Sequence, residues 1–315
     1  MNKPYFLAVV GPTASGKSAL AIQLAKRLNG AIISMDSMQI YRGMDIGTAK
    51  IIDAEKENVI HEMIDIIDPK DEFSVGEYVR RCGSLIRHYS SQGMLPILTG
   101  GTALYLKALI QNFGLGSVPA DEVYRAQLYQ IAGSEIGKLQ LHSMLRSVDK
   151  QAAEKLHPND VRRIVRALEV YKMSGKRFSE QQDREFDTYR YCLIGLTDDR
   201  SALYERINKR VLAMMNQGLL FEVQALINSG VHFSMQSMQG IGYKEFKPYF
   251  ESGCTLEDTT YQIQLNSRHY AKRQLTFFRS FPNLIWLDRR HEALTSTALD
   301  IVFQSDLKGA LFREH

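Results

Sequence analysis

The most regular feature of the chain is a series of short apolar runs separated by longer stretches with helical periodicity. Predominantly apolar residues occupy positions 5–10, 31–35, 95–99 and 284–287, and residues 189–196 have the same strand character. Runs of this length without polar alternation are typical of parallel strands that helices cover on both faces. The pattern predicts an α/β fold, with a parallel sheet flanked by helices.

The segments between these runs predict further elements. We expect a helix over residues 19–28, a strand at residues 63–67, and a helix that begins at Ser74. Ser74 and the glutamate three residues later form a capping box, which marks a helix start, and Gly93 is expected to end this helix. Another helix is predicted to follow the run at 95–99.

Strand signals disappear in the middle of the chain, where helical periodicity with charged faces replaces them. The predicted helices there span residues 121–131, 136–147, 150–156 and 160–174. We interpret this part as an inserted all-helical subdomain. The expected division is a first core part at residues 1–113, the insertion at 114–187 and a second core part at 188–315.

The second core part contains three long features after its first strand. Residues 200–229 are amphipathic, residues 235–244 form a glycine-containing loop, and residues 256–280 are expected to be helical.

Composition narrows the class of protein. With 315 residues and 44% hydrophobic residues, the chain can fill a sizeable core, and no apolar run is as long as a membrane span. Its three cysteines are far apart and include no C-x-x-C pair, which argues against a disulfide framework and a zinc site. The expected location is the reducing cytoplasm. Because the formal charge is only +4, a nucleic-acid site would require local clustering of basic residues.

A phosphate-binding motif lies between the first predicted strand and its helix. It reads Gly11-Pro12-Thr13-Ala14-Ser15-Gly16-Lys17-Ser18. This is the spacing of a P-loop, whose backbone N–H groups and helix N-terminus converge on phosphate oxygens. Lys17 is expected to reach the phosphates and the Ser18 hydroxyl to ligate Mg²⁺. The motif does not specify which phosphate compound binds.

Polar residues follow two other predicted strands. Asp36 comes directly after residues 31–35, at the strand end where α/β sheets bind ligands, so it is a catalytic candidate. The alternative is an ordinary turn or N-cap aspartate. We interpret the segment 39–50 as a functional loop. The strand at 95–99 leads into Gly100-Gly101-Thr102 and offers the neutral Thr102 hydroxyl instead of an acidic residue, which weighs against a kinase or ATPase.

Basic residues cluster on two predicted helices. Arg162 and Arg166 lie one turn apart on the helix at 160–174, although such a run can also be a solvated face. The helix at 256–280 interleaves basic residues with aromatic ones, which suits RNA binding through phosphate neutralisation and base stacking. The alternative is an amphipathic helix with its aromatic residues in the core, as we expect for Phe277.

Six blocks of the chain resemble the bacterial tRNA dimethylallyltransferases, also called tRNA isopentenyltransferases. They are the P-loop, residues 36–50, residues 100–105, residues 157–169, residues 239–245 and residues 270–279. The P-loop alone is generic, but block 36–50 together with the others is specific. Departures are small: Ser18 replaces a frequent threonine, and Phe277-Phe278 replaces Trp-Phe.

The resemblance implies transfer of a dimethylallyl group from dimethylallyl diphosphate to the N6 amine of the adenosine just 3′ of the anticodon, tRNA position 37. In that reaction Asp36 would be the general base, and Thr13 and Thr102 would position the diphosphate or the flipped base. Arg210, the P-loop and Mg²⁺ would neutralise the leaving diphosphate. We expect a monomer that binds the tRNA anticodon stem-loop. The expected tRNA-binding residues are Asp36, Ser37, Met38, Gln39, Arg125, Arg162, Arg163, Arg166, Gln239, Gly240, Ile241, Gly242, Tyr243, Lys244, Lys272, Arg273 and Arg279.

Three other functions stay open from the sequence. An isopentenyltransferase for free adenine nucleotides would use the same P-loop and Asp36, but it would not need the basic helices. A small-molecule kinase would use ATP with the same P-loop. An RNA-binding protein without catalysis would leave both the P-loop and Asp36 unexplained.

Overall fold

The computed structural model describes residues 3–111, 121–180 and 188–311. The chain forms two compact units, one made of residues 1–106 and 187–315 and the other of residues 107–186. The expected insertion border at 113/114 lies outside the described residues, and the border at 187/188 lies at their edge.

The first unit is built on a parallel sheet, as predicted. Among the described residues the sheet has six strands in the order β3-β2-β4-β1-β5-β6. The strands are β1 (Tyr5–Val10), β2 (Gly30–Ser34), β3 (His61–Glu62), β4 (Leu95–Gly100), β5 (Arg190–Thr197) and β6 (Leu284–Asp288). β1 and β4 are buried along their whole length, which explains their uninterrupted apolar sequences.

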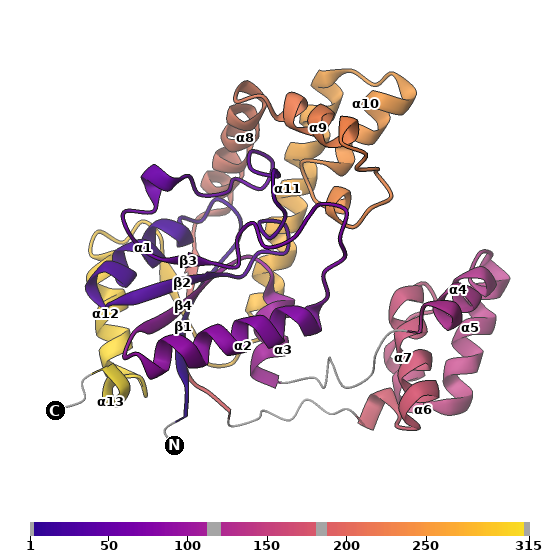
Figure 1. Cartoon of the computed structure of the whole chain (residues 1–315), viewed down its shortest axis with the longest axis horizontal. Coiled ribbons are helices and arrows are strands. Elements are labelled where there is room, and N and C mark those ends of the chain that lie inside the picture. Colours follow the sequence, from indigo (N-terminus) through magenta and orange to yellow (C-terminus); the bar gives the residue numbers. More distant parts are fainter. Residues whose placement is uncertain (1–2, 112–120, 181–187, 312–315) are drawn as a thin grey trace. The chain divides into compact units, whose positions relative to one another are not determined.

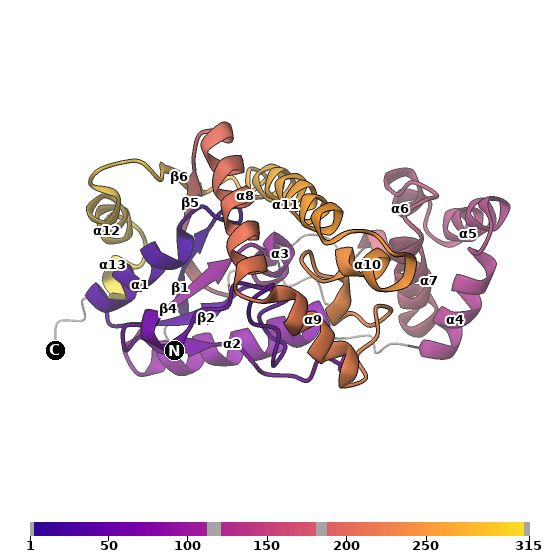
Figure 2. The ribbon, with the colours of Figure 1, turned by 90° about the horizontal axis from the view of Figure 1, so that it is seen from above.

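Helices cover both faces of this sheet. The helices that lie wholly in the first unit are α1 (Lys17–Arg27), α2 (Val75–Ser91), α8 (Arg200–Asn216), α9 (Leu219–Asn228), α10 (Lys247–Ser252), α11 (Leu256–Phe278), α12 (Leu294–Gln304) and α13 (Lys308–Leu311), and α3 (Ala103–Gln111) begins in this unit and ends in the second. The apolar side chains of α1 and α12 share one core cluster with β1, β2, β4 and β5. α2 lies along the sheet, and Figures 1 and 2 show it apart from α1 and α12.

Two expectations about this unit are corrected. The strand expected at residues 63–67 is β3 at His61–Glu62, because Met63 and Asp65 have positive φ angles of 63° and 56°, which end the extended conformation. The amphipathic stretch 200–229 forms two helices, α8 and α9. Gly218 separates them with a φ of 99°, a conformation that side chains other than glycine rarely adopt.

The α2 start follows the capping box. The Ser74 hydroxyl accepts a hydrogen bond from the Glu77 amide at 3.1 Å, and Gly93 has a φ of 72° just after the helix. The sequence therefore predicted both the start and the end of α2.

The second unit is helical in its described part. It contains α4 (Glu122–Ile131), α5 (Glu135–Val148), α6 (Lys150–Lys155) and α7 (Val161–Ser174), which match the predicted helices to within one residue. These helices surround their own core, which includes Leu128, Leu141, Leu145, Ile164 and Leu168. Among the residues that the structure describes, in either unit, no helix is long and apolar enough to cross a membrane.

Candidate active site

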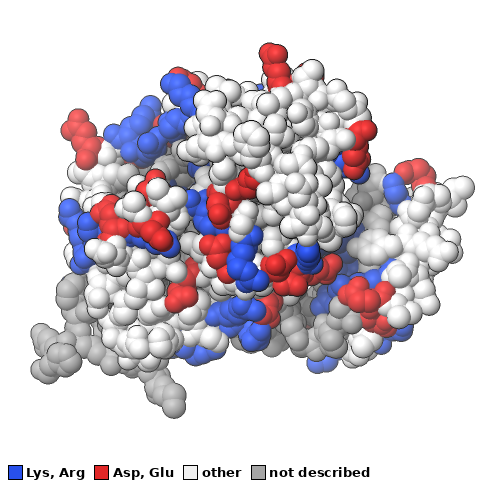
Figure 3. Space-filling view, turned by 45° about the horizontal axis from the view of Figure 1, so that its top comes forward, with Lys and Arg blue, Asp and Glu red and all other residues white. Residues whose placement is uncertain are grey.

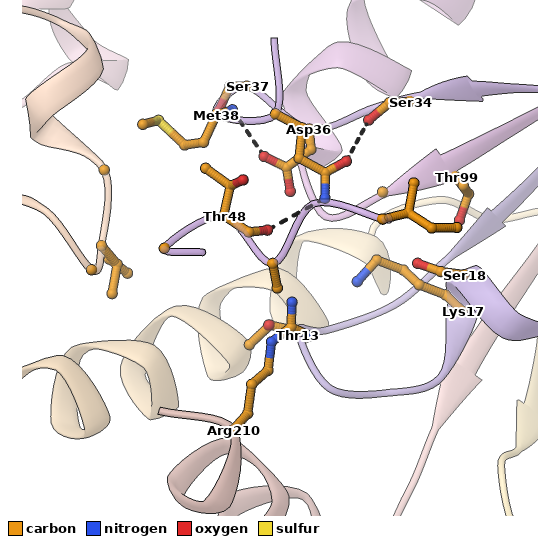
Figure 4. A pocket seen from close by; sticks show the side chains of 18 of the residues that line it. Thr13, Lys17, Ser18, Ser34, Asp36, Ser37, Met38, Thr48, Thr99 and Arg210 are labelled. Carbon is orange, nitrogen blue, oxygen red and sulfur yellow. Dashed lines mark hydrogen bonds between the residues drawn. The ribbon is translucent and has the colours of Figure 1, made fainter. Parts of the chain in front are cut away.

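A cavity of about 930 Å³ lies where strands of the first unit end. Its walls include Thr13 and Lys17 after β1, Asp36 after β2, Thr99 in β4 and Arg210 from α8. Segments far apart in the sequence thus bring the predicted donor-binding and catalytic residues together (Figure 4). This is the arrangement expected for a ligand site at the carboxyl ends of parallel strands.

The P-loop forms the turn that leads into α1. Gly16 precedes the helix in the left-handed conformation, and Ser18 is exposed in the first helical turn. Thr13, Lys17 and Ser18 line the cavity, whereas Gly11, Pro12, Ala14, Ser15 and Gly16 form the turn that carries them. The ammonium of Lys17 donates to the Pro12 carbonyl at 3.1 Å, which keeps it close to the loop.

Among the charged residues that line this cavity, Lys17, Arg210 and Asp36 act on one another. Burial and the nearby Arg210 guanidinium lower the pKa of Lys17 to about 8, against the opposing effect of Asp36. Burial also lowers the pKa of Arg210, again opposed by Asp36. Within the described chain neither cation forms an ion pair. Two partly desolvated cations that repel each other favour an anion between them, and a diphosphate has the required charge.

Asp36 is held by a turn and remains available to a ligand. Its Oδ1 accepts a hydrogen bond from the Met38 amide at 2.9 Å, as in the turn aspartate that the sequence left open. No described residue bonds its Oδ2. The carboxylate is partly exposed and faces the same space as Lys17 and Arg210 (Figure 4). The turn role and a catalytic role are therefore compatible.

Thr102 supports the backbone on both sides of Asp36. Its hydroxyl accepts a hydrogen bond from the Ser37 amide at 3.1 Å, and its amide donates to the Met35 carbonyl at 3.1 Å. Thr102 is absent from the cavity lining. The contact that the structure shows for the Thr102 hydroxyl is with the turn that carries Asp36, and its contact with substrate stays a prediction.

Two of the side chains that hold the functional loop after Asp36 are Gln39 and Glu222. Gln39 accepts from the Ser34 hydroxyl at 2.9 Å and donates to the Thr48 carbonyl at 3.3 Å. Glu222 on α9 accepts hydrogen bonds from the amides of Asp45, Ile46 and Gly47 at 2.9, 2.7 and 3.1 Å. Glu222 was not predicted as part of the site, because nothing in an amphipathic helix indicates a distant loop as partner.

Tyr243 is a correction to the expected tRNA-binding set. Its ring is fully buried, and a Cβ added to Gly47 would lie 2.5 Å from it, so only glycine fits there. The Tyr243 side chain is therefore inside the protein and not at an RNA surface. Its neighbours Gln239, Gly240, Ile241 and Gly242, together with Lys244, do line the cavity.

The basic helix α11 presents a mixed surface. Lys272, Arg273 and Arg279 are exposed, and Arg273 reaches the cavity. Phe278 is fully buried, whereas Phe277 is partly exposed in a shallow hollow with Lys272 and Arg273; the core position expected for Phe277 was wrong. Figure 3 shows basic and acidic residues interspersed over the face in view, so positive charge is local.

The arginines expected in the helical unit fall into two pairs. Arg125 and Arg166 both bind the buried carboxylate of Glu169, at 2.7 and 2.5 Å. Arg162 and Arg163 are exposed and form no ion pair with any residue in the described ranges. The structure therefore assigns Arg125 and Arg166 a stabilising contact within their own unit. Arg162 and Arg163 are the freer candidates for phosphate contacts.

Two further residues bind the P-loop from a distance. Arg206 on α8 donates to the Ala14 carbonyl at 3.1 Å and pairs with Asp198. The side chain of Gln274 on α11 accepts from the Thr13 amide at 3.0 Å. Gln274 lies in the family-like block 270–279 but carried no chemical signal, since an amide on a helix has no preferred partner.

Comparisons with known proteins agree on one family. The family model described as IPP transferase matches residues 39–281. A tRNA dimethylallyltransferase of Bacillus cereus (strain B4264) is 48% identical over 294 residues, which cover 92% of either chain. The tRNA dimethylallyltransferase of Halalkalibacterium halodurans is 47% identical and covers 91% of both chains.

The solved structures that resemble this chain are, by their names, of transferases that act on tRNA. The crystal structure of a tRNA isopentenylpyrophosphate transferase from Bacillus halodurans aligns with a TM-score of 0.73 and 43% identity, covering 98% of this chain and 97% of that one. A eukaryotic dimethylallyltransferase acting on tRNA aligns with a TM-score of 0.82 and 26% identity, covering 98% of this chain and 84% of its own.

Proposed function

The chain belongs to the IPP transferase family, and on that premise we propose that it transfers a dimethylallyl group from dimethylallyl diphosphate to N6 of the adenosine at tRNA position 37. The relatives that carry this activity in their names match nine tenths of the chain. The observation that supports the chemistry most directly is the placement of Lys17 and Arg210 around the same cavity as Asp36.

The donor half of the reaction needs a stabilised leaving group. When the bond between C1 of the allyl group and the diphosphate oxygen breaks, negative charge grows on the diphosphate. Lys17, Arg210 and the P-loop amides are placed to stabilise this charge, and desolvation strengthens their effect. The same charges attract the diphosphate before the reaction, so they contribute to binding as well.

The acceptor half needs a base. As the N6 nitrogen forms its bond to C1, it must lose a proton. In our proposal the Oδ2 of Asp36, which faces the cavity together with Lys17 and Arg210, accepts that proton, while Oδ1 stays bonded to the Met38 amide. The adenine must leave the anticodon stack to reach Asp36, because a stacked base is not accessible to the cavity.

Mg²⁺ is the proposed cofactor. Among the described residues no group of three His, Cys, Asp or Glu side chains could hold a metal ion, so a cation here would depend on the diphosphate oxygens. That fits Mg²⁺, which keeps few protein ligands and binds substrate phosphates. Ser18 is exposed at the cavity and would hold it. When bound, the ion would neutralise charge on the leaving diphosphate.

The proposed partner is the tRNA anticodon stem-loop. We also propose that the protein is a monomer and that it is located in the cytoplasm. Exposed basic residues on both units support RNA binding, namely Arg162, Arg163, Lys244, Lys272, Arg273 and Arg279. A free adenine nucleotide would need none of them.

The experiment that tests the function is a labelling assay. The protein is incubated with unmodified tRNA, dimethylallyl diphosphate labelled in the allyl group and Mg²⁺, and the RNA is digested to nucleosides. We expect label on the adenosine next to the anticodon. A parallel incubation contains AMP in place of tRNA, and label on AMP but not on tRNA would identify the nucleotide-specific alternative. In a third incubation ATP replaces dimethylallyl diphosphate, and phosphoryl transfer there, with no allyl transfer in the other two, would identify the kinase.

A further inference from the structure

Gln274 joins two loops that belong to different strands. Its Oε1 accepts a hydrogen bond from the Thr13 amide in the P-loop, and its Nε2 donates to the Gly101 carbonyl after β4, both at 3.0 Å. The side chain is buried, with 4% of the residue exposed. A single amide thus fills both of its main hydrogen-bonding roles with backbone groups on opposite sides.

The space around this amide permits little movement. A Cβ added to Gly101 would lie 2.0 Å from Gln274 Nε2, so the close approach requires glycine at that position. Tyr270, one helical turn earlier, is buried enough that the pKa of its hydroxyl is raised to about 12, and the Thr102 and Gln274 side chains act on this hydroxyl. The position of Gln274 is therefore fixed from the helix as well as from the two loops.

Each loop carries one half of the proposed reaction. Thr13 belongs to the P-loop, where the diphosphate binds in the proposal above. Gly101 directly precedes Thr102, whose hydroxyl and amide hold the residues on either side of Asp36. The hydrogen bonds through Gln274 accordingly connect the loop for the donor to the turn for the base.

We propose that Gln274 is a positioning residue, which sets the separation between the donor diphosphate and the adenine amine held at Asp36. The assignment rests on the proposed function. Transfer between two substrates requires the reacting atoms to lie about 3–3.5 Å apart and aligned, and a displacement of about 1 Å can lower the rate by about 10². Gln274 lies in the cavity wall, and in this assignment it acts through its hydrogen bonds to Thr13 and Gly101.

A misplaced acceptor has a measurable chemical consequence. If the allylic C1–O bond breaks while the amine is out of reach, water can attack the allyl group in its place. The water oxygen then forms the new bond to carbon, its proton passes to solvent, and the products are dimethylallyl alcohol and diphosphate. The ratio of alcohol to prenylated tRNA therefore reports alignment, whereas a general loss of folded protein lowers both products equally.

The test compares variants at two glutamines of the same helix. Gln274→Met keeps the length and removes both hydrogen bonds, and Gln274→Glu keeps the acceptor for Thr13 but loses the donor to Gly101. Gln264→Met is the matched control, because Gln264 Nε2 donates to the Asn208 carbonyl on α8 at 3.3 Å and Gln264 does not line the cavity. Thermal unfolding of each variant is recorded, so that folded protein is compared.

We expect Gln274→Met to lose about 10² in kcat for tRNA prenylation. The KM values for both substrates should change little, and the ratio of alcohol to prenylated tRNA should rise. Gln274→Glu should show the same rise to a smaller extent, and it supplies the measurement if the methionine variant does not fold. Gln264→Met should keep the parent ratio.

Two outcomes separate this assignment from the function on which it rests. If the parent protein prenylates tRNA and the product ratio is the same in the Gln274 variants as in Gln264→Met, the assignment is wrong and the function stands. If the parent protein forms no prenylated tRNA, the proposed function fails first, and the assignment fails with it.

Discussion

The hydroxyl of Tyr243 donates a 2.6 Å hydrogen bond to Glu222 Oε1, the same oxygen that accepts from the Gly47 amide. One carboxylate thereby ties two glycine-containing loops to α9. Both loops contribute to the cavity, Thr48 from one and Lys244 from the other. The shape of the candidate site therefore depends on a residue that lies outside it.

Removal of this carboxylate should loosen the loop after Asp36. Glu222→Ala leaves three backbone amides and one hydroxyl without their acceptor, and we expect a loss of about 1–3 kcal/mol in the free energy of unfolding. Hydrogen exchange of residues 44–48 should become faster. Glu205→Ala, which removes an exposed carboxylate paired with Lys209, is the control and should change stability by less than about 0.5 kcal/mol. Equal effects of the two substitutions would show that the loop is held by other contacts.

The lowered pKa of Lys17 predicts a pH dependence of diphosphate binding. A lysine is charged below its pKa, so with a value of about 8 Lys17 loses its charge as the pH rises beyond that point. Calorimetric affinity for inorganic diphosphate should therefore fall by up to about tenfold per pH unit above pH 8. Lys17→Arg stays charged and should show a flatter profile. If the two profiles coincide, Lys17 does not contact the diphosphate.

The lowered pKa of Lys17 also makes the free energy of unfolding depend on pH. Whereas diphosphate affinity should fall as the pH rises, stability should increase. Between pH 8 and the ordinary value of 10.5, the unfolded chain binds more protons at Lys17 than the folded one does. The contribution of Lys17 to the free energy of unfolding should therefore rise with pH in this window. In Lys17→Met that rise should be absent.

Two arginines of α7 should contribute to different properties, Arg162 to tRNA binding and Arg166 to stability. Arg162 is exposed and without an ion pair to described residues, so Arg162→Ala should lower the slope of log tRNA affinity against log salt by about 1 and leave donor binding unchanged. Arg166 shares the buried Glu169 with Arg125, so Arg166→Ala should destabilise the helical unit by about 2 kcal/mol. Salt-dependent filter binding and urea unfolding measure the two effects. An unchanged slope in Arg162→Ala would make this face of α7 merely solvated.

The sequence predicted the elements whose signals are local. The apolar strands other than the one expected at 63–67, the P-loop and the capped start of α2 each depend on a few adjacent residues, and the structure has them. Asp36 could be placed in the crevice because the carboxyl ends of parallel strands meet at one edge. The break at Gly218 was visible as a glycine, but its φ could not be read from the residue type.

Long-range contacts were not predictable in the same way. Glu222, Gln274 and Arg206 each bind backbone groups that lie far away in the chain, and their identities do not specify these partners. Tyr243 illustrates the reverse error, since a residue that looks suited to RNA is buried inside the fold, and Arg166 has an ion pair with Glu169 that competes with an RNA contact. Burial decides between these roles, and burial depends on the tertiary structure.

The central claim is that Asp36 takes the proton from the attacking amine, and single-turnover prenylation by Asp36→Asn tests it most directly. The asparagine oxygen can still accept from the Met38 amide, so the turn should persist. With tRNA and donor prebound, the rate of transfer should fall by about 10² to 10⁴ at unchanged tRNA affinity. Asp45→Asn, on the same loop but outside the cavity, should keep the parent rate. A near-parent rate in folded Asp36→Asn would contradict the account and place the base elsewhere.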